Sequence, residues 1–202
     1  MIAALLLATS ALAADGLYAP APPPGSAFVR VVNATDAPTK GVAVAGKPLG
    51  ALEPGACSPY VVVPEGARSA ALGGGLKASV EVHGGAFYTI GVLPGPQQLV
   101  LEDATNPNLA RARVTLYNLS GAPSVDLKLA DGAQTVVAGV APGETGHRVV
   151  NPVSADLAVF AGDAPVETFT GLHLERGAAY SVFVTGAPGA LSASWVVDET
   201  RP

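Results

Sequence analysis

The side chains best able to carry out chemistry in this sequence are three histidines and one cysteine: His83, His147, His173 and Cys57. No histidine lies at a metal-ligand spacing, such as HxxxH, from another histidine, cysteine or carboxylate. A nucleophilic triad needs a nucleophile, a base and an orienting acid, and neither a GxSxG elbow nor any other motif proposes one. We therefore predict no catalytic residue, no metal site and no cofactor. The histidines are expected at the surface or in turns, and Cys57 is expected to be a small buried hydrophobe.

The charge of the chain argues against nucleic acid as a partner. Charged residues make up 13% of the sequence, the net charge is −5, and only 11 residues are Lys or Arg, with no basic run. Nucleic-acid binding depends on a basic patch that neutralises phosphates. The same shortage of cations weakens the case for tight, direct binding of a long polyanion.

The sequence repeats itself once. Matched positions are 85 residues apart early in the repeat, 88 in the middle and 92 toward its end, as expected if turns changed length after a duplication. The pairs include Val29 and Val114, Val31 and Leu116, Asn33 and Asn118, Pro64 and Pro152, and Tyr88 and Tyr180. This period exceeds the roughly 20–50 residues of solenoid repeats, so each copy should be a small domain.

Each copy reads as a series of short strands. Val-rich segments are separated by turns rich in the 24 Gly and 18 Pro, giving about seven strands per copy and no helical period. The sequence predicts an all-β fold of two tandem immunoglobulin-like, or carbohydrate-binding-module-like, antiparallel β-sandwiches from an internal duplication. Alternation places Val29, Val31 and Asn33 inward. We expect Asn33 and Asn118 to bind turn backbone, since asparagine side chains commonly do so.

The chain divides into five predicted segments. An apolar start followed by Ala11-Leu12-Ala13 is typical of a secretory signal peptide, although the usual positive charge is missing. The segments are a signal peptide (1–14), a Pro-rich lead (15–26), a first β-sandwich (27–103), a linker (104–109) and a second β-sandwich (110–202). After residue 14 no continuous apolar stretch is long enough to span a membrane, so we predict none in the mature chain.

Candidate binding residues lie on the outward strand faces. Phe28 beside Arg30, and Arg113 beside Tyr117, suit a protein–protein contact, in which Arg and Tyr are common anchors. The alternative for each is a solvated strand face. Tyr60 and Trp195 are the candidates for polymer binding, although scattered aromatic residues more often serve packing.

Four stretches in order give a family resemblance: LYAP…FVRVVNA within 15–34, VTLYNLSG at 114–121, RVVNP at 148–152 and AAYSVFVTG at 178–186. Together they resemble the alginate biosynthesis accessory protein AlgF family over nearly the whole mature chain. A shorter pattern within each copy also resembles a widespread family of bacterial extracytoplasmic β-sandwich repeats.

The resemblance to the AlgF family implies a periplasmic protein of the machinery that acetylates mannuronate hydroxyls in alginate. It implies two partners, a periplasmic polysaccharide O-acetyltransferase with a Ser-His-Asp site and a membrane-bound acetyl-transfer protein. Relatives in systems for other polysaccharides, including cellulose, leave the polymer open.

Three functions remain to be compared. The first is a non-catalytic adaptor that holds an acetyltransferase near the acetyl exporter, which needs exposed faces and no catalytic residues. The second is a carbohydrate-binding module that guides the exopolysaccharide, which needs an aromatic or basic groove. The third is an acetyltransferase, which needs a nucleophile and a base. The sequence favours the adaptor.

Overall fold

The computed structural model describes residues 21–201, and all regular secondary structure in this range is β-strand. The first domain contains β1 (Ser26–Asn33), β2 (Thr39–Val44), β3 (Lys47–Leu52), β4 (Tyr60–Pro64), β5 (Gly66–Ala71), β6 (Lys77–Val82), β7 (Phe87–Leu93) and β8 (Gln97–Asp103). The second contains β9 (Ala112–Asn118), β10 (Val125–Leu129), β11 (Thr135–Val140), β12 (Thr145–Val150), β13 (Val153–Ala161), β14 (Ala164–Leu174), β15 (Ala179–Ala187) and β16 (Ala190–Val197). The predicted signal peptide and the start of the Pro-rich lead lie outside the described residues.

The two domains share one topology, which confirms the predicted tandem duplication. In the first domain the sheets have the orders β17-β4-β1-β7-β8 and β3-β2-β5-β6. In the second they have the orders β12-β9-β15-β16 and β11-β10-β13-β14, which match strand for strand. Each domain is a two-sheet sandwich, but the pairs β1–β7 and β9–β15 are parallel, so the sandwiches are not wholly antiparallel.

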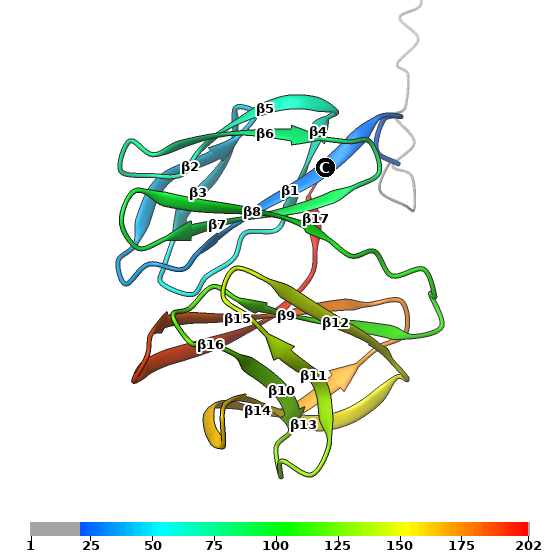
Figure 1. Cartoon of the computed structure of the whole chain (residues 1–202). Coiled ribbons are helices and arrows are strands. Elements are labelled where there is room, and N and C mark those ends of the chain that lie inside the picture. The colour runs from blue at the N-terminus through cyan, green and yellow to red at the C-terminus, as the bar shows by residue number, and fades with distance from the viewer. Residues whose placement is uncertain (1–20, 202) are drawn as a thin grey trace, which may run out of the picture.

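The strand count and one boundary differ from the sequence prediction. Each copy has eight strands where about seven were expected. In addition, β17 (Thr200–Arg201) belongs by sequence to the second predicted sandwich, yet it pairs in parallel with β4 of the first domain. Figure 1 shows this last segment running from the lower half of the molecule up to the edge of the upper sheet.

The inward faces of the strands form a separate core in each domain. Val29 and Val31 are buried in the first core, as the alternation predicted, and their repeat partners Val114 and Leu116 are buried in the second. Tyr88 and its repeat partner Tyr180 are buried in the same two cores. The two tyrosine hydroxyls accept bonds from the backbone N–H five residues upstream, at His83 (3.3 Å) and Glu175 (2.9 Å). Such a bond resembles the tyrosine corner of immunoglobulin-like sandwiches.

Asn33 and Asn118 end the first strand of each copy, and both serve the following turn as predicted. The Asn33 amide donates to the carbonyls of Ala37 and Leu52, both at 2.9 Å, and its oxygen accepts from Thr35. Asn118 makes the equivalent bonds to Ala122 and Val140, both at 3.0 Å. The repeated residue is therefore structural.

The four sheets stack as layers, and one sheet of each domain faces the other domain (Figure 1). We call β17-β4-β1-β7-β8 and β12-β9-β15-β16 the inner sheets, because their outward faces meet between the domains. This arrangement decides which side chains remain exposed. Within residues 21–201 no helix is long and apolar enough to cross a membrane.

Candidate functional site

The domains join through a third hydrophobic cluster, formed by the outward faces of the inner sheets. Its buried members come from both domains: Val32, Ala34, Tyr117, Leu119 and Phe183. Partly buried Cys57, Leu93, Leu99, Leu101 and Val196 pack against them. Residues that point away from each domain's own core are therefore covered by the neighbouring domain.

Three predicted partner-binding residues lie in this covered interface. Arg30, Arg113 and Tyr117 are only 1%, 5% and 0% exposed. The expectation that they lie on an exposed strand face is wrong, because alternation identifies the side of a strand but not what packs against it. Their contribution to partner binding stays a prediction, and it would require the domains to separate.

Arg30 lies at the centre of a buried polar network that spans both domains. Its guanidinium donates within the first domain to Thr89 Oγ1 at 2.9 Å. It also reaches three groups of the second domain: Asp198 Oδ1 at 2.7 Å, Ser181 Oγ at 2.8 Å and the Tyr117 hydroxyl at 3.0 Å. A buried cation is tolerated only when it is paired and hydrogen-bonded, so Arg30 requires the second domain.

Asp103 provides a second carboxylate on the first-domain side of the network. It accepts from the hydroxyls of Tyr117 (2.7 Å), Thr89 (2.7 Å) and Tyr60 (2.8 Å). In the second domain Ser181 donates to Asp198 at 2.7 Å, as Thr89 does to Asp103. The strand registers align Thr89 with Ser181, and Asp103 with Asp198, across the repeat. These two hydroxyl–carboxylate pairs therefore occupy equivalent positions in the two copies.

Arg113 extends the network toward the surface and is incompletely bonded. Its Nη2 lies 3.2 Å from Asp198 Oδ2. Its Nε is buried and has no hydrogen-bond partner within the described part of the chain, and the same holds for Thr115 Oγ1. Two arginines and two aspartates thus balance in formal charge, but among these residues the Arg113 Nε–H finds no acceptor.

Burial shifts the pKa values of several groups around Arg30. It raises the pKa of the Cys57 thiol to about 12, although the Arg30 charge opposes this shift. Burial likewise raises the pKa of the Tyr60 and Tyr117 hydroxyls well above their usual range. For Arg30 itself burial lowers the pKa, but neighbouring acidic groups hold it well above its ordinary value, so the guanidinium remains charged.

The two residues predicted to bind polymer are packing residues in this structure. Tyr60 is 2% exposed, and its ring lies 4.3 Å from the Arg30 guanidinium carbon. Trp195 packs on the second core between Phe169 and Tyr180, with ring centroids 5.8 and 5.3 Å away. Neither offers the exposed aromatic platform that the sequence analysis considered.

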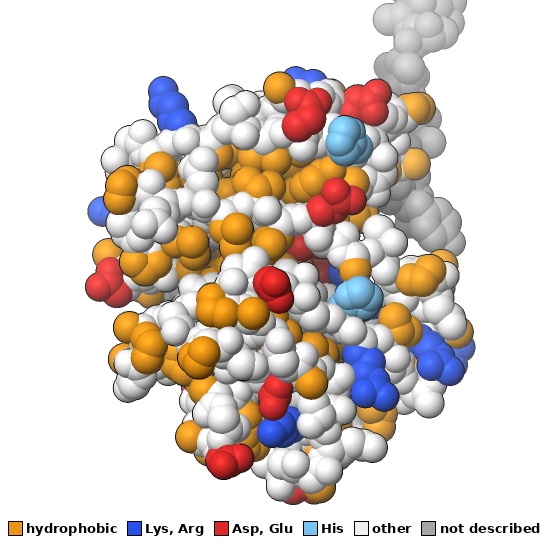
Figure 2. Space-filling view, in the orientation of Figure 1, with side chains coloured by type: hydrophobic (Ala, Val, Ile, Leu, Met, Phe, Trp, Pro, Cys, Tyr) orange, Lys and Arg blue, Asp and Glu red, His pale blue; other side chains and the backbone are white. Residues whose placement is uncertain are grey.

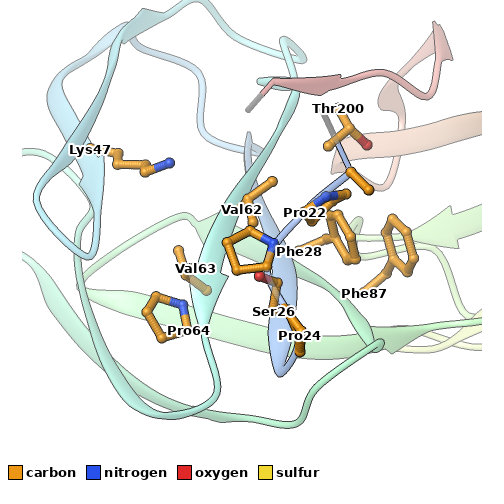
Figure 3. Close-up of a pocket in the computed structure, with 12 residues that line it drawn as sticks. Pro22, Pro24, Ser26, Phe28, Lys47, Val62, Val63, Pro64, Phe87 and Thr200 are labelled. Atoms are coloured by element: carbon orange, nitrogen blue, oxygen red, sulfur yellow. The ribbon is translucent and has the colours of Figure 1, made fainter. Parts of the chain in front are cut away.

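Phe28, the fourth predicted partner-binding residue, is partly exposed and lines an apolar hollow of about 880 Å³. Its ring stacks on Phe87 at a centroid distance of 4.3 Å. Figure 3 shows the two rings side by side near Thr200, while Lys47 lies on the opposite rim. Pro22, Pro23, Pro24, Val62 and Pro64 line much of the remaining wall. The hollow is therefore almost wholly apolar.

A smaller cleft of about 310 Å³ lies between the domains and shares Phe87 and Thr200 with the apolar hollow. The linker residues Thr105 and Asn106 form one side, and Arg113 lines the cleft. On the face of the molecule seen in Figure 2, hydrophobic side chains lie over both halves and cationic side chains lie in small, separate groups.

One pair of potential catalytic side chains lies far from this interface. Ser154 Oγ and His173 Nδ1 are 2.7 Å apart on the neighbouring strands β13 and β14, and both are exposed. No acid hydrogen-bonds to His173 within residues 21–201, and a serine–histidine nucleophile normally depends on such an orienting group. In the described range no group of three or more His, Cys, Asp or Glu is placed to hold a metal ion.

Sequence reasoning missed Thr89, Ser181, Asp103 and Asp198 as members of one network. A signal existed, because the aligned segments AFYTIGV and AAYSVFV place a hydroxyl at the same outward position. Asp103 is the last residue of β8 and Asp198 directly follows β16, and in the sequence both read as loop residues. Only the packing of the sheets brings them to Arg30.

A family model described as "Alginate O-acetyl transferase AlgF" matches residues 2–181. Several curated relatives carry the name "Alginate biosynthesis protein AlgF". That of Pseudomonas putida is 36% identical over 92% of this chain and 84% of its own length. That of Pseudomonas aeruginosa is 34% identical over 96% and 90%, and that of Azotobacter vinelandii is 33% identical over 89% and 82%.

Two solved structures are also similar. The C-terminal domain of AlgF from P. aeruginosa is 40% identical, covers 44% of this chain and 98% of its own, and has a TM-score of 0.40. The N-terminal domain of AlgF from the same organism is 28% identical, covers 41% and 98%, and has a TM-score of 0.36.

Replacing Arg30 should show that the buried network stabilises the fold more than a surface ion pair does. We expect Arg30→Met to lower the free energy of unfolding by about 3–5 kcal/mol, because Asp198 would lose its closest cation. Adding Asp198→Asn should restore part of this loss. Urea denaturation measures both. Lys128→Met, which removes the more exposed pair with Asp126 at 3.2 Å, should cost no more than about 1 kcal/mol. Equal losses for the two single variants would contradict the role given to Arg30.

Alkaline pH should destabilise the fold. Above about pH 8.5 an unfolded Cys57 loses its proton, whereas the folded thiol keeps it up to its pKa of about 12. The unfolded state then binds fewer protons, so the free energy of unfolding falls by about 1.4 kcal/mol per pH unit for this group. Tyr60 and Tyr117 should steepen the fall above about pH 10. Urea denaturation from neutral to alkaline pH tests this, and Cys57→Ala should remove the first part of the decline. A flat profile would count against the burial of these groups.

Proposed function

We propose that this chain, which belongs to the alginate O-acetyl transferase AlgF family, is a non-catalytic adaptor in an exopolysaccharide O-acetylation complex. In this role it links a membrane-bound acetyl-transfer protein to a periplasmic polysaccharide O-acetyltransferase. Its site of action is the periplasm, a proposal supported by the signal-peptide pattern at the N-terminus. An adaptor contributes by raising the local concentration of one component near the other.

The apolar hollow around Phe28 and Phe87 is the observation that carries this proposal. Among residues 21–201 its lining is almost wholly hydrophobic, and Lys47, Ser26 and Thr200 contribute the polar side chains. Contiguous exposed apolar surface on a soluble domain commonly marks a protein–protein contact. A hollow with few hydrogen-bonding groups suits aromatic or aliphatic anchors of a protein better than the hydroxyls of a polysaccharide.

The rigid join between the domains supports the same role. The hydrophobic cluster between the inner sheets and the Arg30 network hold the second domain against the first. The network includes the ion pair from Arg30 Nη1 to Asp198 Oδ1, at 2.7 Å. An adaptor with two surfaces held at a fixed spacing can orient two partners relative to each other. The hollow lies on the first domain. The sheet β11-β10-β13-β14 of the second domain, which faces away from the first, is therefore available for the other partner.

Capture of the acetyltransferase should depend on the hollow. We expect Phe28→Ala and Phe87→Ala to weaken binding at least about 30-fold, because truncating a central aromatic anchor commonly costs about 2 kcal/mol or more. The measurement is periplasmic cross-linking with a tagged chain, followed by identification and quantification of the O-acetyltransferase. Phe160→Ala, on β13 of the second domain, is the matched control, and thermal unfolding verifies that each variant is folded. Undiminished capture by both hollow variants would remove this surface from the proposal.

Direct acetyl chemistry is the second candidate, because Ser154 and His173 lie in hydrogen-bond contact. An adaptor should not hydrolyse a chromogenic acetyl ester faster than its Ser154→Ala variant does, since within the described residues no acid hydrogen-bonds to the imidazole of the exposed pair. Release of the chromophore by the two folded proteins is the measurement. A serine-dependent burst would overturn the non-catalytic role and move attention to β13 and β14.

A further inference from the structure

We infer that the free edge of β16 (Ala190–Val197) binds an extended, uncharged segment of a partner protein, which joins the inner sheet as a further strand. β16 is the end strand of the sheet β12-β9-β15-β16 in the second domain (Figure 1). Adding a strand to an open sheet edge is a recurrent mode of peptide recognition, in which main-chain hydrogen bonds supply the affinity. This surface is distinct from the apolar hollow, and the inference rests on the adaptor role only for the partner's identity.

The backbone of β16 is hydrogen-bonded on one side. The antiparallel register pairs Val197 with Tyr180, and the next residue, Asp198, donates from its N–H to the Ala179 carbonyl at 2.9 Å. Because bonded and non-bonded pairs alternate along antiparallel strands, every second residue of β16 directs its N–H and C=O away from β15. These residues are Leu191, Ala193, Trp195 and Val197. Among residues 21–201 no other strand pairs with them, so their donors and acceptors face outward.

β16 lacks the features that commonly protect sheet edges. Charged side chains, prolines and bulges keep edge strands from pairing with other chains. The sequence of β16, ALSASWVV, contains no charge and no proline, and its register with β15 continues along its 8 residues without a shift. Each other edge strand in the described part of the chain carries at least one such feature. They are Lys47 and Pro48 in β3, Lys77 and Glu81 in β6, Glu102 in β8, Arg148 in β12, Arg201 in β17, and register shifts in β11 and β14.

The repeat equivalent of β16 is β8, and this equivalent edge is protected. Gln98 pairs with Val92 as Ala193 pairs with Val184, so Gln98 and Ala193 occupy the same position in the two copies. In β8 two glutamines precede the apolar centre and Glu102 follows it, whereas β16 is uncharged throughout. One chain therefore contains a protected and an unprotected version of the same edge.

The side chains of β16 define the chemistry of the segment. Leu191 and Trp195 pack against the second core. Ser194 points the other way and donates to the Gly55 carbonyl of the first domain at 2.8 Å. Cross-strand neighbours share a face of the sheet, so the segment needs apolar side chains at alternate positions and small polar ones between them. One of its apolar side chains would cover Val197, which is 51% exposed. A charged side chain would find no opposite charge on β16.

The first domain restricts what can reach this edge. The bond from Ser194 to Gly55 holds a loop of the first domain over the middle of β16. A second folded copy would bring its own loop to the same place, whereas an extended segment needs only the width of one strand, about 4.8 Å. The chain end already binds in this way, since the two residues of β17 add to the edge of β4. An extended segment is therefore the occupant that fits.

Replacing Ala193 with proline tests the edge. Ala193→Pro removes an outward N–H but no bond to β15, and proline is tolerated at sheet edges. Gln98→Pro removes the equivalent N–H of β8 and is the matched control. Tagged full-length chains are cross-linked in the periplasm, and the O-acetyltransferase and the membrane-bound acetyl-transfer protein are quantified. We expect Ala193→Pro to lower recovery of one of them at least about tenfold, because main-chain hydrogen bonds to the partner are lost. Gln98→Pro should stay within about twofold of the parent chain.

The outcomes separate this inference from the adaptor role. Unchanged recovery of both proteins by Ala193→Pro, shown to be folded by thermal unfolding, would overturn the inference and leave the adaptor role intact. An equal loss with Gln98→Pro would also overturn it, because the effect would not be specific to β16. Recovery of neither protein by the parent chain would overturn the adaptor role and this inference with it. A dimer of the purified parent that Ala193→Pro abolishes in sedimentation would assign the edge to a second copy and overturn the extended segment.

Amide hydrogen exchange of the full chain tests the edge without any substitution. In the free chain the amides of Ala193 and Trp195 should exchange about tenfold or more faster than those of Ser194 and Val196, which are bonded to β15. In the purified complex with the retained partner this alternation should disappear, because the added strand protects the outward amides. Slow exchange of Ala193 and Trp195 in the free chain would show that the edge is already covered. Fast exchange in the complex would show that the partner binds elsewhere, and either result would overturn the inference.

Discussion

A single buried positive charge constrains the architecture of this protein. Arg30 projects from the first domain into a region from which water is excluded, and its nearest carboxylate, Asp198, follows it by 168 residues. Removing an arginine from water is unfavourable unless ionic and hydrogen-bonding partners replace the water. Those partners lie on β9, β15 and the segment after β16, so the charge is compensated only when the two inner sheets are face to face. The apolar cluster around Tyr117 and Phe183 contributes the buried hydrophobic surface between the sheets, whereas the Arg30 network fixes their relative position.

The duplication explains how one chain acquired matching surfaces. Thr89 with Asp103, and Ser181 with Asp198, are the same pair in the two copies, and each pair faces the opposite domain. Ser194 bonds Gly55 of the first domain at 2.8 Å, and Leu99 lies beside Gly143, the repeat partner of Gly55. The two subunits of a symmetric dimer contact each other through the same surface patch on each subunit. The interface within this chain has that character, with one strong asymmetry: Arg30 matches Thr115, so only one copy supplies the central cation.

Most of the fold could be predicted from the sequence, but the site could not. Alternation in β1 and β9 identified the inward residues Val29 and Val114, because burial in each core depends on local period. The role of Arg30 depends on which sheets pack together. The sequence of a strand does not predict which element packs against its outward face. Arg30 and Tyr117 therefore read as exposed anchors, whereas Phe28, two residues earlier on the same face, lies beyond the second domain and remains accessible. That Arg113 Nε lacks an acceptor among residues 21–201 is likewise a consequence of packing, and it has no sequence signature.

The return of the chain end to the first domain affects the order in which the structure can be completed. β17 forms the edge of the first domain's inner sheet, beside β4, although it follows every strand of the second domain. Domains generally fold in the order in which they are synthesised, N-terminal first. Here the first sandwich can collapse early around its own core, but it lacks an edge strand and a counterion for Arg30 until the second sandwich has formed. A chain truncated before Asp198 would therefore lack both the strand that covers β4 and the carboxylate that pairs with Arg30.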